Sequence, residues 1–208
     1  MTASETDDFT PTQIFATPLW VRRVVGFEQI NADIRALLPQ LRTESAERRS
    51  NEGGWHSQTN LHTDDRLAQI RKIIGTTSAG CATSIGFDFT RHNLVFQSLW
   101  ININGHGHSN RAHVHPQSFL SGAYYVDMPK DGGNIELFDP IAARVMSPFP
   151  ADDLSPYTGQ LLEHTCREGD LLVFPGWLQH SVQRNESNRD RISISFNMTF
   201  ESKPNTQR

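Results

Sequence analysis

Residues 111–126 read RAHVHPQSFLSGAYYV, in which two histidines stand one residue apart just before a run of strongly β-forming side chains. His113 and His115 occupy positions i and i+2, so on an extended segment both side chains lie on the same side of the sheet. Neutral imidazoles placed side by side suit a divalent metal, but a solvated surface also carries such pairs. The pair alone does not distinguish a metal site from a solvated surface, so evidence from the rest of the chain is needed.

After residue 92 the sequence has the pattern of a β protein. Short runs of branched and aromatic residues are separated by Gly, Pro, Asn and Asp at the spacing typical of a sandwich or barrel. In the last run, polar residues at 191, 193, 195 and 197 alternate with apolar residues, which predicts one face toward a cavity and the other toward helices. The predicted strands are 93–104, 118–126, 134–138, 160–166, 170–174 and 191–200.

The first 92 residues are mixed and partly helical. Residues 12–25 have the composition of an early strand, and 27–38 carry apolar residues along one helical face. Residues 51–60 are predicted to be a loop, and a second helix is expected to begin near Thr63 or Asp64, either of which suits an N-cap.

Helices first and strands after predict a mainly β fold with N-terminal helices (α+β), a jelly roll with the helices packed on its major sheet. No internal repeat or low-complexity linker divides the chain. We therefore predict one domain, 1–208, made of a mixed helical part at 1–92 and a jelly-roll core at 93–201.

Composition excludes several classes of protein. The chain has 19 basic and 23 acidic residues with no basic block, which argues against a nucleic-acid partner bound through its phosphates. No apolar stretch approaches the roughly 20 residues of a membrane-spanning helix. The start, MTASETDDF, lacks the pattern of an export signal, so Cys81 and Cys166 are expected to be reduced thiols in a cytoplasmic protein. The sequence does not indicate an oligomeric state.

A second histidine signal lies in GDLLVFPGWLQHSV (169–182). A Gly-Asp turn leads into an apolar strand, Pro-Gly turns the chain, and His180 follows where extended structure resumes. If His180 joins the earlier pair inside a barrel, three imidazoles suit Fe(II), Zn, Ni or Cu by ligand type.

The C-terminal part, from about 94 to 200, resembles the iron(II)- and 2-oxoglutarate-dependent oxygenases of the double-stranded β-helix fold, especially their small bacterial and phage-associated branch. The resemblance covers about half the chain and implies Fe(II) as cofactor, 2-oxoglutarate and O2 as co-substrates, and hydroxylation of a substrate with formation of succinate and CO2. The matching segments are, in order, H-x-H at 113–115, SGAYYV at 121–126 with GGNIELFDP at 132–140, GDLLVFPGWLQH at 169–180, and RISISFN at 191–197.

By this resemblance His113 is the first iron ligand and His180 the distal histidine. His115 stands where most of the superfamily has Asp or Glu, and a third neutral ligand leaves the iron site one unit more positive than two histidines and a carboxylate do. We favour His115 as the third ligand. The alternatives are a water or a nearby carboxylate: Asp127, Glu136 or Asp139.

Arg191 and Ser193 are the predicted co-substrate residues, because Arg-x-Ser on a strand puts a guanidinium and a hydroxyl on one face. A guanidinium binds a carboxylate in bidentate fashion, which suits the distal carboxylate of 2-oxoglutarate. Tyr125 is the third candidate, by its resemblance to a tyrosine that reaches the co-substrate in prolyl-hydroxylase-like members. The alternative is that Arg191 pairs with an aspartate and that Ser193 has no special role.

The remaining polar residues are less specific. His106 and His108 share the i, i+2 spacing but lie in a Gly-rich loop, so we expect a solvated loop or the rim of the site. Trp55 is predicted to be either a lid or a core anchor, and Asn102 and Asn104 either orient a ligand or cap a strand end. The other histidines, at 56, 62, 92 and 164, are expected at the surface or in hydrogen bonds, and the Pro-rich stretch 141–159 is expected to cover the substrate side.

Two rival functions remain open from the sequence. A cupin-type metalloenzyme without 2-oxoglutarate, an isomerase or a dioxygenase, fits Gly107 followed by five residues and then His113-x-His115, but Phe119 and Leu120 stand where its glutamate belongs. A non-catalytic jelly-roll binding module predicts no convergent metal ligands. Arg191-x-Ser193 favours the oxygenase. Whether the substrate is a small molecule or a peptide is not specified by the sequence.

Overall fold

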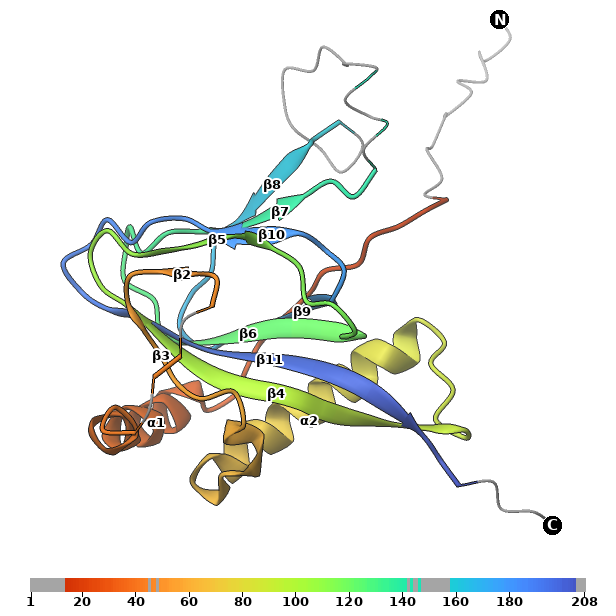
Figure 1. Cartoon of the computed structure of the whole chain (residues 1–208), viewed down its shortest axis with the longest axis horizontal. Coiled ribbons are helices and arrows are strands. Elements are labelled where there is room, and N and C mark those ends of the chain that lie inside the picture. Colours follow the sequence, from red (N-terminus) through yellow and green to blue (C-terminus); the bar gives the residue numbers. More distant parts are fainter. Residues whose placement is uncertain are drawn as a thin grey trace, which may run out of the picture.

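The computed structural model describes residues 14–44, 46–47, 49–141, 143, 146 and 158–204. Within these residues, eleven strands form two antiparallel sheets (Figure 1). The larger sheet has the order β1 (Trp20–Arg23), β9 (Asp170–Pro175), β6 (Leu120–Asp127), β11 (Arg191–Ser202), β4 (His92–Asn104) and β3 (Trp55–His56). The smaller sheet has the order β2 (Asn51–Glu52), β5 (Ser109–His113), β10 (His180–Val182), β7 (Ile135–Phe138) and β8 (Leu161–His164).

The two long helices, α1 (Phe27–Leu41) and α2 (Ala68–Ser84), lie on one side of the larger sheet, and the smaller sheet lies on the other (Figure 1). α1 begins after Gly26, whose φ of 71° is in the left-handed region that glycine adopts readily. Apolar residues of both helices recur at helical spacing and join the core of the larger sheet. These residues are Ile30, Ile34, Leu38 and Leu41 from α1, and Ile70, Ile74 and Cys81 from α2.

The central strand β11 shows how this layering places the polar pocket. Ile192, Ile194 and Phe196 belong to the core that faces the helices. The intervening Arg191, Ser193 and Ser195 line a pocket on the other face of the strand. The alternation predicted for this strand is therefore confirmed, as is a jelly roll with helices on its larger sheet.

The second helix begins later than predicted. Residues Leu61–Thr63 and Asp65–Leu67 form short 3₁₀ turns, and Asp64 caps the second of them by accepting a hydrogen bond from the Arg66 backbone amide at 2.9 Å. The predicted capping residue thus caps a 3₁₀ turn, and α2 follows at Ala68. Among the described residues, no helix combines the length and apolar character needed to cross a membrane.

The strand predictions for the first half of the chain need correction. Residues 12–13 lie outside the described residues, and only Trp20–Arg23 of the predicted strand 12–25 pairs, with β9. The predicted loop 51–60 contains β2 and β3, two-residue strands at sheet edges. β5 was missed because its sequence, SNRAH, has no apolar alternation; it is a strand because it pairs with β2 and β10. Most of 141–159 lies outside the described residues.

Candidate functional site

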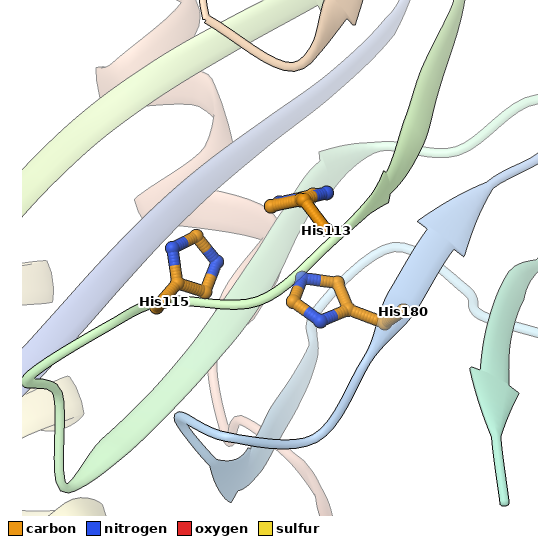
Figure 2. Close-up of side chains that lie close together, drawn as sticks. All are labelled: His113, His115 and His180. Carbon is orange, nitrogen blue, oxygen red and sulfur yellow. The ribbon is translucent and has the colours of Figure 1, made fainter.

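Three histidines come together between the two sheets. His113 ends β5 and His180 begins β10, where the two residues are direct partners in the strand register. His115 lies two residues beyond β5. The ring centroids are 4.4 Å apart for His113 and His180, 4.9 Å for His113 and His115, and 5.1 Å for His115 and His180. Figure 2 shows the rings around a common space, and one nitrogen of each lies within 4.8 Å of the others.

Hydrogen bonds to the backbone orient two of these rings. His113 Nδ1 is 2.6 Å from the Arg111 carbonyl oxygen, and His180 Nδ1 is 2.9 Å from that of Leu178. Because a carbonyl oxygen only accepts, each Nδ1 carries the proton of the neutral ring, and each Nε2 keeps a lone pair. His115 is held through its backbone amide, which donates to the Gly176 carbonyl at 2.9 Å.

Burial keeps these imidazoles neutral. Desolvation, together with the neighbouring His180 and His113, lowers the pKa of His115 to about 3. Desolvation and the nearby His113 lower the pKa of His180 to about 4. The pKa of His113 is also lowered, mainly by desolvation. At neutral pH the cluster therefore offers three neutral nitrogen ligands.

The three carboxylates considered as a third ligand are not part of this cluster. Asp127 pairs with Arg35 at 2.8 Å and with Arg189 at 3.1 Å. Glu136 accepts hydrogen bonds from Ser181 and Gln183. The Asp139 carboxylate accepts from the Ile141 backbone amide at 3.0 Å. Among the described residues, the group of side chains suited to a metal contains the three histidines and no carboxylate.

Arg191 lies in the same pocket as the histidines and is almost completely buried, with 2% of its surface exposed. Its Nη1 donates to the carbonyls of Gly132 and Gln183, the latter at 2.9 Å. Its Nη2 is buried without a hydrogen-bond partner. Desolvation lowers the pKa of the guanidinium. A buried cationic donor left unpaired is costly, so this atom is suited to an anionic ligand.

The alternative pairing of Arg191 with an aspartate is not observed, since no carboxylate among the described residues lies within ion-pair distance of it. Gly133 explains part of its position. This glycine has a φ of 87°, and a Cβ there would lie 2.8 Å from Arg191 Nη1. The close approach of the 132–133 backbone to the guanidinium therefore requires glycine.

Ser193 and Tyr125 line the pocket beside Arg191. Ser193 is paired in register with Tyr125 on β6 and with Asn102 on β4. Desolvation, together with the Cys166 thiol, raises the pKa of Tyr125 well above its usual value. The phenol therefore stays protonated and able to donate a hydrogen bond.

Asn102 also belongs to this pocket, whereas Asn104 does not line it. Asn102 Nδ2 donates to Ser195 Oγ at 3.1 Å, and its Oδ1 is buried without a partner. Of the two alternatives for Asn102, the structure favours contact with a ligand over strand-end capping. Asn104 instead accepts a hydrogen bond at its backbone carbonyl from Asn185, at 2.8 Å.

The other polar candidates lie outside the histidine cluster. His108 Nδ1 accepts from the Gly105 backbone amide at 3.0 Å, and His106 is exposed, so this pair belongs to the loop. His56 is buried and stacked on Trp100 at 5.7 Å. Trp55 packs against the main core, as expected of the core-anchor alternative.

The sequence analysis assigned no role to several residues around the histidines. Asn197 was noted there only as part of the polar face of the last strand, but its Nδ2 lies 3.4 Å from His115 Nδ1. No pattern pointed to the others, because the strand pairing that brings them to the pocket joins segments far apart in sequence. They include Ser50, Trp100, Asn110 and Val182.

Residues 98–197 match the family model described as "Putative 2OG-Fe(II) oxygenase". A search of curated proteins found no match.

Among solved structures, a prolyl-4-hydroxylase from Pseudomonas putida is 14% identical, with a TM-score of 0.61 over 88% of this chain and 92% of that one. A prolyl hydroxylase from Trichoplax adhaerens, in complex with a hypoxia inducible factor peptide fragment, is 9% identical, with a TM-score of 0.61 over 87% and 83% of the two chains. HygX from Streptomyces hygroscopicus, with nickel and 2-oxoglutarate bound, is 11% identical, with a TM-score of 0.59 over 88% and 83%. These likenesses show a shared double-stranded β-helix fold. The family match and the shared fold together identify residues 98–197 as a 2OG-Fe(II) oxygenase domain, the catalytic domain of enzymes that use Fe(II), 2-oxoglutarate and O2.

Proposed function

We propose that His113, His115 and His180 bind the Fe(II), and that Arg191, Ser193 and Tyr125 bind the distal carboxylate of 2-oxoglutarate. One observation carries this assignment: the unpaired Nη2 of a buried arginine lies in the same pocket as three converging neutral imidazoles. The uncompensated charge of the buried guanidinium suits an anionic co-substrate, and the three converging lone pairs suit a metal ion.

The donor set fits iron. Imidazole is a ligand that Fe, Zn, Ni and Cu all accept, so the histidines are compatible with Fe(II) without selecting it by affinity. When bound, Fe(II) supplies the activation of O2 that couples decarboxylation of 2-oxoglutarate, to succinate and CO2, with oxidation of a substrate C–H bond. The hydrogen bonds at Nδ1 of His113 and His180 fix the tautomer in which Nε2 is free to bind.

The part of the pocket lined by Arg191 fits a carboxylate. The Arg191 guanidinium contributes Nη2, and the Ser193 and protonated Tyr125 hydroxyls contribute one donor each. Since Nη1 is already held by two carbonyls, the guanidinium cannot rotate freely, and its remaining donor is preorganised. Burial of these groups excludes water and strengthens their hold on an anion.

We propose hydroxylation of a small molecule or a peptide as the reaction. Asn102 Oδ1 is an acceptor without a partner, and 2-oxoglutarate has no hydrogen to donate to it. It therefore suits an N–H or O–H group of the substrate. A cytoplasmic location also belongs to this proposal, supported by two free, buried cysteines, Cys81 and Cys166.

Succinate formation tests the proposal. Protein supplied with Fe(II), ascorbate and 2-oxoglutarate is expected to form succinate slowly even without substrate. Arg191→Met should raise the 2-oxoglutarate concentration needed for half-maximal turnover by at least about tenfold, because a charge-assisted hydrogen bond is lost. The matched control is Arg184→Met, which removes an exposed arginine seven residues away and should leave turnover unchanged.

A folded, iron-loaded protein that forms no succinate contradicts the proposal. Metal-dependent activity that survives Arg191→Met unchanged contradicts the co-substrate assignment, and it favours a cupin-type enzyme that works without 2-oxoglutarate.

A further inference from the structure

His115 lacks the support that orients the other two histidines. His113 and His180 each direct Nδ1 at a backbone carbonyl. The contact of His115 Nδ1 is instead the side-chain amide of Asn197, with Nδ2 at 3.4 Å. The tautomer that this contact selects decides whether His115 Nε2 is free to bind a metal. Its importance therefore rests on the metal site proposed above.

Asn197 is itself held in place from β6. It is 9% exposed and is the register partner of Ser121, which is 1% exposed. Ser121 Oγ lies 2.8 Å from Asn197 Oδ1 and 3.2 Å from the Phe196 carbonyl oxygen. The three side chains therefore form a short chain, Ser121 to Asn197 to His115.

A count of hydrogens decides between the two orientations of this amide. With Oδ1 toward Ser121, the single hydroxyl hydrogen faces two acceptors. With Nδ2 toward His115, Nδ1 must accept, which puts the ring proton on Nε2, where it blocks the metal. Rotating the amide by 180° exchanges its oxygen and nitrogen at almost no change in shape. Nδ2 then donates to Ser121 Oγ, Ser121 donates to the Phe196 carbonyl, and Oδ1 accepts from His115 Nδ1–H, so every group in the chain is satisfied.

We propose that Asn197 is a positioning residue: its amide oxygen, held in place by Ser121, accepts a hydrogen bond from His115 Nδ1–H. A side-chain amide thus does for His115 what backbone carbonyls do for His113 and His180, and all three rings present Nε2 to one point. Such outer partners fix ring orientation, and their loss typically weakens metal binding by 10- to 100-fold.

The tautomer can be read directly in metal-free protein, by long-range proton–nitrogen NMR correlations of ¹⁵N-labelled histidine. His115 is expected to carry its proton on Nδ1. His113 and His180 are internal references, because their carbonyl contacts allow only that tautomer. Asn197→Asp offers only acceptor oxygens and should keep the proton on Nδ1, whereas Asn197→Leu removes the partner at similar size and should lose this preference.

Metal affinity provides the second readout. In a Co(II) competition titration, Asn197→Leu should bind about 10- to 100-fold more weakly than wild type, and Asn197→Asp should stay close to wild type. Ser121→Ala is the milder variant, to be used where Asn197→Leu does not fold; it frees the amide to rotate and should give a mixed His115 tautomer.

A proton on His115 Nε2 in the wild type overturns the inference. So does an Asn197→Asp variant whose Co(II) affinity falls as much as that of Asn197→Leu. If the wild type carries the proton on Nδ1 but binds no Co(II), the amide orientation stands and the metal site proposed above fails.

Discussion

His113 and His180 stand directly opposite each other on antiparallel strands β5 and β10, with ring centroids 4.4 Å apart, although 67 positions separate them in the sequence. Directly opposed residues have Cβ atoms about 5 Å apart, so the register alone brings the two rings together. Since β10 also pairs with β7, this register is fixed on both sides of His180. Two of the three proposed metal ligands are thus positioned by strand pairing.

The third ligand can be tested by two substitutions at one position. His115→Leu should weaken Fe(II) or Co(II) binding by at least about 100-fold, since a ligand matters more than the outer partner of one. His115→Asp introduces a carboxylate ligand and should bind the metal more tightly than His115→Leu does. Competition titration under anaerobic conditions measures both. Affinity unchanged in His115→Leu would show that another group or water fills the third place.

Gly133 provides a test of Arg191 that leaves its charge in place. Gly133→Ala puts a Cβ 2.5 Å from the Gln183 carbonyl oxygen, 2.6 Å from that of Arg184 and 2.8 Å from Arg191 Nη1. It should weaken 2-oxoglutarate binding by about tenfold or more, because the guanidinium and the Gln183 carbonyl that holds it both have to move. Gly107→Ala is the matched control: its φ of 77° imposes similar backbone strain, but a Cβ there meets nothing within 4 Å. Isothermal titration measures the affinity. An equal loss of 2-oxoglutarate affinity in the two variants would mean that backbone strain alone causes the loss.

The buried histidines predict acid-sensitive stability in metal-free protein. His56 is buried, and desolvation lowers its pKa below the usual 6.5, as it does for the three clustered histidines. Below about pH 6.5 the unfolded chain binds protons that the folded one excludes, so the free energy of unfolding should fall as the pH falls. His56→Gln should reduce this slope by up to about 1.4 kcal/mol per pH unit. Urea unfolding between pH 7.5 and 5, with chelator present, measures it. An unchanged slope would contradict the burial argument for His56.

A substitution on the helix-covered face of the larger sheet should lower stability without changing metal binding. Ile74→Ala removes a fully buried side chain of α2 and should lower the free energy of unfolding by about 2–5 kcal/mol, because it leaves a cavity. Ile85→Ala, at a half-exposed position just after the helix, should change it by less than about 0.5 kcal/mol. Metal affinity of the folded Ile74→Ala protein should match wild type, since α2 and the histidines lie on opposite sides of the larger sheet. Lost affinity in folded protein would show that the two faces are coupled.

The sequence predicted the parts of the fold that depend on local pattern. The strands with clear apolar alternation, such as 93–104 and 191–200, and the helix at 27–38 appear within a few residues of their expected bounds. β5 and β2 could not be predicted, because their polar residues become strands only through pairing with distant segments.

The site divides in the same way. His113, His115, His180, Arg191, Ser193 and Tyr125 could be named in advance because they stand in short motifs, and the structure places all six around one pocket. Asn197 and Ser121 could not be connected to His115 from the sequence. Their connection depends on the register between β11 and β6 and on the course of the chain after β5, neither of which is encoded locally.

The central claim is that the three imidazoles and the Arg191 guanidinium serve one metal and one co-substrate. The most direct measurement is an anaerobic titration of Fe(II)-loaded protein with 2-oxoglutarate, followed by visible absorption. The account predicts a saturable charge-transfer band in the wild type, no band in His180→Ala, and saturation only at much higher 2-oxoglutarate in Arg191→Met. A folded, iron-loaded wild type without the band, or a band unaffected by either substitution, would contradict it.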